Sequence, residues 1–137
     1  MSGINLQIPI NNLTAGTADE SGLFPGVLVR KKLPIVTEVT GSGEANITFT
    51  LRNGPGVLKE FAYCNTSVPD SWVVATESTP DFQVIRDPNG NISSVVDKEL
   101  STAARNAQGE AAYQYLLLVE QPDGTQFLVD PEIHNQA

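Results

Sequence analysis

The sequence predicts an all-β domain, a two-sheet antiparallel sandwich with an extended N-terminal arm and one short helical insert near residues 97–107. Two observations lead to this fold class. Short β-prone runs alternate with turn signals rich in Gly, Pro, Asn and Asp, and apolar residues recur at every second position within the runs. At 137 residues the chain is long enough for one domain with a buried core.

The first eighteen residues carry no charged side chain and begin with a half-buried strand pattern. Pro9 has no N–H to donate, so this strand should lie at a sheet edge or against a neighbouring chain. We expect this N-terminal arm to bind a protein partner through its apolar residues, which are Ile4, Leu6, Ile8, Ile10 and Leu13.

Six further β-prone runs follow between turn signals: residues 27–31, 33–40, 46–52, 57–64, 71–76 and 82–86. The clearest alternation places Ile47, Phe49 and Leu51 on one face, which we expect to pack inward. The turns are predicted at residues 24–26, 41–43, 53–56 and 87–90, where Gly and Pro supply the required backbone geometry.

A hairpin is predicted near the C-terminus, with strands at residues 113–120 and 125–129 around the turn Pro122-Asp123-Gly124. Its first strand is apolar on both faces, because Leu116 and Leu118 lie opposite the face that carries Tyr113 and Leu117. That pattern predicts a central strand covered on both sides.

The helical insert is predicted from Asp97 as a cap, from two alanines that favour helix, and from Gly109 as a terminator. We expect residues 1–26 to form the arm and residues 27–137 the sandwich, which is either Ig-like or jelly-roll-like. A small barrel is the alternative architecture.

The net charge of −8 is confined to residues 64–137, whereas the acids and bases of residues 1–63 cancel. This balance opposes nucleic-acid binding, and no apolar run is long enough to span a membrane. The N-terminus lacks the pattern of a signal peptide, and the single cysteine permits no internal disulfide. We therefore expect synthesis in a cytoplasm and Cys64 as a small buried hydrophobe.

Groups that carry catalysis are scarce, so the sequence predicts a non-enzymatic protein without cofactor or metal. His134 is the single histidine, and together with one cysteine it cannot supply a protein zinc site. Asp87, Asn89 and Asn91 have the spacing of the first calcium ligands of an EF-hand, but the later positions do not match, so a β-turn is expected.

Two further sets of residues are candidate contact sites. The basic run Arg30-Lys31-Lys32 suits docking on an acidic protein surface, or an ordinary solvated edge. Trp72 and Tyr63 form the alternative site, in which exposed aromatic rings of a soluble binding module stack on a carbohydrate or another ligand.

In size and organisation, with an uncharged arm, a β body and acidic outer charge, the chain resembles the small β-sandwich decoration (cement) proteins of tailed-phage capsids. Tail accessory proteins share these traits. The resemblance implies a virion structural protein made in the host cytoplasm, which contacts capsid or tail subunits or further copies of itself as a homo-oligomer. The alternative location is the bacterial cytoplasm.

Overall fold

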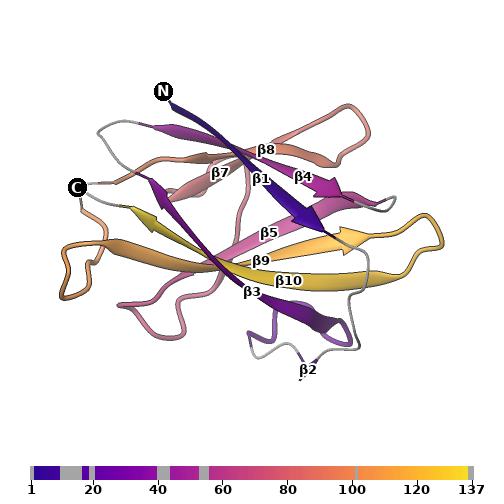
Figure 1. The fold of residues 1–137 in the computed structure, drawn as a ribbon, viewed down its shortest axis with the longest axis horizontal. Helices are drawn as coiled ribbons and strands as arrows, with labels where there is room; N and C mark the ends of the chain where they lie inside the picture. Colours follow the sequence, from indigo (N-terminus) through magenta and orange to yellow (C-terminus); the bar gives the residue numbers. More distant parts are fainter. Residues whose placement is uncertain are drawn as a thin grey trace.

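The computed structural model describes residues 2–9, 17–18, 21–39, 44–52, 56–100 and 102–135. It is all-β, with two sheets stacked face to face (Figure 1). The predicted sandwich is thereby confirmed at the level of two packed β-sheets.

The smaller sheet has four strands in the order β1-β4-β8-β7. Their bounds are β1 (Ser2–Pro9), β4 (Ala45–Arg52), β8 (Ile92–Asp97) and β7 (Phe82–Arg86). The larger sheet has six strands in the order β2-β3-β10-β9-β5-β6. Their bounds are β2 (Thr17–Ala18), β3 (Leu28–Val39), β10 (Gln126–Asn135), β9 (Ala111–Glu120), β5 (Val57–Asn65) and β6 (Val73–Val74).

The predicted N-terminal strand exists, and it lies at the edge of the four-stranded sheet as Pro9 requires. β1 runs parallel to β4 of the same chain, from Ser2 opposite Ala45 to Pro9 opposite Arg52. Ile4 packs against the core, and the exposed Asn5 accepts a hydrogen bond of 2.9 Å from the Thr50 hydroxyl. The strand therefore finds its ladder partner within its own chain.

The space between the sheets is filled by an aromatic network, which we call the inner core. Phe61 is fully buried at its centre, with ring centroids 5.5 Å from Phe82, 5.3 Å from Tyr115 and 6.0 Å from Phe49. Ile47 and Phe49 point into this core, as the alternation of β4 predicts. Offset and tilted ring pairs of this kind add stability beyond their buried area.

β9 is a central strand that is apolar on both faces, as predicted. Tyr113 and Leu117 face the inner core, whereas Leu116 and Leu118 belong to a second apolar cluster. The hairpin to β10 is also confirmed. Its turn has Gly124 at a φ of 88°, a left-handed conformation that glycine adopts without strain.

Two prolines inside long strands share one irregularity. The β3–β10 ladder pairs Lys32 with Asp130 and resumes at Val36 with Glu132. Pro34 and Pro131 both lie in the interval between these pairs, where no ladder N–H is required. β3 therefore continues through Lys32, where the sequence predicted a break between two separate runs.

The predicted helical insert is absent. Asp97 is the last residue of β8, paired with Ala45 and with Phe82, and although its carboxylate accepts the Glu99 N–H, no helix follows among the described residues. The described residues from 98 to 110 form turns and irregular backbone. In the described part of the chain there is no helix long and apolar enough to cross a membrane. The sequence interpretation also missed β8 and overestimated β6, which spans Val73–Val74 only.

Candidate functional site

The outward face of the six-stranded sheet carries an apolar row that crosses four strands. Val29 of β3 is opposite Leu128 of β10, which is opposite Leu118 of β9. Beside this row, Leu116 of β9 is opposite Ala62 of β5. These five residues are buried and form what we call the outer-face cluster.

Five apolar residues cover this cluster, and each of these cover residues is only partly buried. Three of them, Leu23, Phe24 and Val27, come from the segment that enters β3, and the other two are Trp72 and Val74. The segment is held by a turn in which the Val27 N–H donates to the Phe24 carbonyl at 3.2 Å. Among the described residues, the cover thus consists of one irregular segment together with Trp72 and Val74.

Charge is arranged unevenly across this sheet. Arg30-Lys31-Lys32 occupy consecutive positions on β3, toward one edge. At the opposite edge the exposed Asp70 and Glu77 precede and follow β6. The backbone thus places the basic run toward one edge and these two exposed carboxylates at the other, although Asp130 and Glu132 of β10 lie next to β3 on the basic side.

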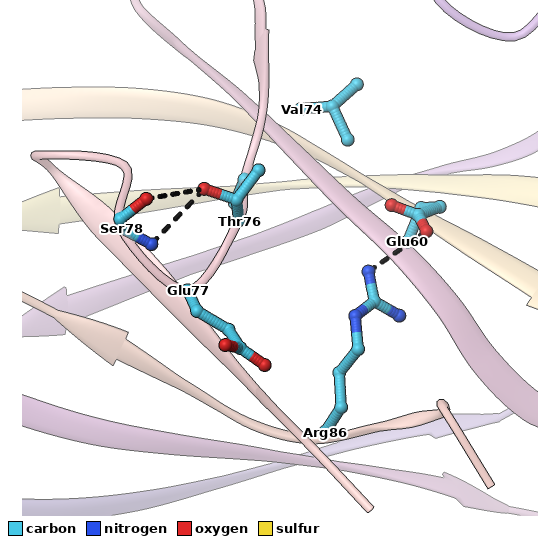
Figure 2. A pocket seen from close by; sticks show the side chains of 7 residues that line it. Glu60, Val74, Thr76, Glu77, Ser78 and Arg86 are labelled. Carbon is cyan, nitrogen blue, oxygen red and sulfur yellow. Dashed lines mark hydrogen bonds and ion pairs between the residues drawn. The ribbon is translucent and has the colours of Figure 1, made fainter.

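An open pocket of about 370 Å³ lies beside β6, where the two sheets meet (Figure 2). Arg86 of β7 reaches across it and donates to Glu60 of β5 at 3.0 Å. Nη1 of the same guanidinium donates to the backbone carbonyls of Lys59 at 3.0 Å and Gly90 at 2.8 Å. The arginine thus clamps the two sheets together. The hydroxyls of Thr76 and Ser78, which lie 3.4 Å apart, line the remaining wall.

The predicted contact residues of the arm are described only in part. Ile4 lies against the inner core, so it serves the fold of its own chain. Leu6 and Ile8 are opposite Phe49 and Leu51 in the β1–β4 ladder, but their side chains lie outside the described residues. Ile10 and Leu13 lie entirely outside them.

The basic run Arg30-Lys31-Lys32 is placed on β3, with Lys31 opposite Val129 and Lys32 opposite Asp130 in the ladder with β10. The side chains of the three basic residues are outside the described part of the chain. That this run contacts a protein partner therefore stays a prediction.

The alternative pair of aromatic residues is not brought together. The ring of Tyr63 lies in the inner core, 5.0 Å from Phe82 between centroids, and only 4% of the residue is exposed. Trp72 lies on the opposite face of the sheet with the outer-face cluster. Tyr63 therefore cannot stack on a ligand, because alternation along β5 turns its ring inward.

Two predictions about local chemistry are confirmed. Cys64 is buried beneath the loop that joins β5 to β6, with its Sγ 3.4 Å from the Ser71 hydroxyl. The segment from Asp87 forms a β-turn, in which the Asp87 carboxylate accepts the N–H groups of Asn89 and Asn91. Among the described residues, no cluster of three or more His, Cys, Asp or Glu side chains could hold a metal ion.

A second polar feature closes one end of the sandwich. Asp97 of β8 is fully buried and accepts a hydrogen bond of 2.8 Å from the side-chain amide of Asn135 on β10. Burial raises the pKa of Asp97 to about 6, although the N–H of Glu99 and the Asn135 amide counteract it. Nearby, Tyr113 donates to Asp81 at 2.8 Å, and burial is the largest cause of the raised pKa of this tyrosine.

The sequence contained a signal for the outer-face cluster in Leu116 and Leu118. Trp72 of the cover was also singled out from the sequence, whereas Leu23, Phe24 and Val27 show no strand or helix period and gave no signal. The Asp97–Asn135 contact joins residues 38 positions apart. Such a pair has no local pattern in the sequence.

No protein-family model and no curated protein sequence matches the chain. Among solved structures, one of murine CRIg is similar to this chain, with a TM-score of 0.39 and 18% sequence identity. That similarity covers 75% of this chain and 92% of the other. At this level the comparison adds nothing about function.

Proposed function

We propose that this chain is a non-enzymatic assembly domain, which binds a second copy of itself through the outward face of its six-stranded sheet. The observation that carries the proposal is the outer-face cluster with its thin, partly exposed apolar cover. Soluble monomers rarely leave a large apolar patch exposed, and such patches mark contact surfaces.

The charges on either side of the cluster favour a second copy as the partner. A two-fold axis along the strands, near β10 and β9, lays the β3 edge of one copy over the β5–β6 edge of the other. The basic run on β3 then meets the acidic edge near Asp70 and Glu77, twice in each dimer. Two-fold dimers with the same patch on both subunits are the commonest oligomers.

The strand order supports an Ig-like sandwich as the finer fold class. β4, β8 and β7 correspond to strands B, E and D, and β10, β9, β5 and β6 correspond to G, F, C and C′ of a variable-type domain. β1 occupies the edge next to B, where strand A normally lies, but runs parallel to its neighbour. The proposed surface is then the GFC sheet.

The setting in a tailed-phage virion stays a prediction, as does the expected location. In such a setting the same surface would join copies on the shell. The carbohydrate-binding alternative loses one of its two aromatic residues, because Tyr63 is part of the inner core.

The proposal is tested by analytical ultracentrifugation of the full chain and two matched variants. Trp72→Glu places a charge on the cover, and we expect at least about a tenfold weaker dimer, because central aromatic residues dominate such contacts. Ile85→Glu makes the same change at a residue 47% exposed on β7 of the other sheet, and we expect no effect on the dimer.

Circular dichroism and urea unfolding establish that both variants are folded. Reversal of Arg30, Lys31 and Lys32 to Glu should weaken the dimer at low salt, with a smaller effect at high salt. A wild-type chain that stays monomeric at about 100 μM, or a dimer that Ile85→Glu disrupts and Trp72→Glu does not, contradicts the proposed surface.

A further inference from the structure

The end of the sandwich at which β8 and β10 terminate holds one buried polar contact between the sheets. Asp97 and Asn135 are 0% and 3% exposed. In the four-stranded sheet, Asp97 lies between Ala45 and Phe82, and in the six-stranded sheet Asn135 is opposite Ala111. These neighbours are apolar and buried, so the two polar groups have little besides each other to bind.

The contact is incomplete as a set of hydrogen bonds. Asp97 Oδ1 accepts from Asn135 Nδ2 at 2.8 Å and from the Glu99 N–H at 3.0 Å. Asp97 Oδ2 and Asn135 Oδ1 are both buried and have no partner among the described residues. Both atoms are acceptors, so they cannot satisfy each other, and a buried unpaired acceptor costs about 1–3 kcal/mol.

One proton corrects both deficits. A carboxylic acid and a carboxamide are complementary, since each offers one donor and one acceptor on the same edge. We propose that Asp97 takes up a proton from solvent on Oδ2 and donates it to Asn135 Oδ1, forming an acid–amide pair that fastens β8 to β10 and loosens as the pH rises.

The negative groups around Asp97 favour this proton. Asp81, just before β7, and Glu99, just after β8, both raise its pKa by electrostatic repulsion, in addition to the larger effect of burial. The pKa of Glu99 is itself raised, chiefly by burial, while Arg105 lowers it.

Among the described residues, the other elements around the pair supply no cation that contacts the carboxylate. On β9 the nearest titratable group is Tyr113, whose hydroxyl is bound to Asp81. Arg105 donates to the Asn135 backbone carbonyl at 3.4 Å and to the Gly109 carbonyl at 2.9 Å. Ahead of β4, Glu44 is paired with Lys98.

The direction of the pH dependence follows from these values. The pKa of Asp97 is about 6 in the folded chain and about 3.9 when unfolded, so between these values the folded state binds more protons. The contribution of Asp97 to stability is therefore complete below about pH 4, declines as the pH rises through 6, and is constant above.

The test compares wild type with Asp97→Asn in urea unfolding from about pH 3.5 to about pH 8. An Asn at this position presents the protonated form's donor at every pH, so the two chains should be about equally stable at the acid end. At pH 8 the folding equilibrium constant of the variant should exceed that of wild type by roughly 100-fold. Glu77→Gln, which removes an exposed carboxylate, should run parallel to wild type.

Carbon-13 NMR titration of the Asp97 carboxyl in the wild-type chain keeps the test independent of how the variant folds. We expect a midpoint near 6. A midpoint below about 4.5, or a stability ratio that does not change with pH, overturns the proposal. So does stabilisation of the wild type by calcium chloride at pH 8 that Asp97→Asn abolishes, since the pair would then be a cation site. The proposed dimer can fail without affecting these results.

Discussion

β9 separates two apolar clusters that are built differently. The inner core lies between two sheets and consists of interlocking aromatic rings, several of them fully buried. The outer-face cluster is aliphatic, and the described residues that cover it, Leu23, Phe24, Val27, Trp72 and Val74, are only partly buried. The same strand therefore packs against a second sheet on one face and beneath a partly buried cover on the other.

The largest effect expected from this difference is at Phe61, at the centre of the aromatic network. Phe61→Ala leaves a cavity that rigid neighbouring rings cannot fill, and it should lower the free energy of unfolding by about 3–5 kcal/mol. Phe24→Ala, on the cover, should cost about 1 kcal/mol, because its ring is already partly in water. Equal losses in urea unfolding would show that the two clusters do not differ.

Adjacent leucines on β9 offer the closest match. Leu117 faces the inner core and Leu116 the outer-face cluster, with exposures of 0% and 2%. We expect Leu117→Ala to cost about 4 kcal/mol and Leu116→Ala about 2–3 kcal/mol, since partly buried cover residues can collapse onto the smaller side chain more readily than the rings of the inner core can. Both losses of unfolding free energy can be measured by denaturant titration at protein concentrations too low for the proposed dimer to form. A larger loss for Leu116→Ala than for Leu117→Ala would contradict the expected difference between the two clusters.

A smaller effect is expected within the inner core, at two tyrosines with different hydrogen bonding. Tyr113→Phe removes the bond to Asp81 and should lower the free energy of unfolding by about 1–2 kcal/mol. The hydroxyl of Tyr115 is buried without a partner among the described residues. Tyr115→Phe should therefore leave stability unchanged or raise it, as urea unfolding would show.

Local patterns accounted for most of the strands. Ile47, Phe49 and Leu51 fixed the inward face of β4, and Leu116 with Leu118 identified a strand covered on both sides. The turn before β10 followed from Pro122-Asp123-Gly124, because each residue there has a backbone preference that the turn uses.

The failures arose where distant contacts override local preference. Asp97 has the side chain of a helix cap, but pairing with Ala45 and Phe82 makes it the end of a strand. Tyr63 is close to Trp72 in the sequence, which suggested a shared contact site, but alternation along β5 turns its ring into the inner core. The parallel partner of β1 lies 43 positions away at Ala45, and such pairing leaves no mark in either segment alone.

The position of β10 governs the order in which this sheet can form. β10 lies between β3 and β9, so β2 and β3 join the rest of the sheet only through it. Val29 of β3 can pair with β10 only after Leu128 has been synthesised, and these two residues are far apart in the sequence. Pairings of such high contact order are slow to form, and during synthesis β3 would leave the ribosome long before its neighbour. Until β10 is made, the described part of β3 is paired only at Leu28 and Val29, with β2, and the rest of the strand must be protected from other chains.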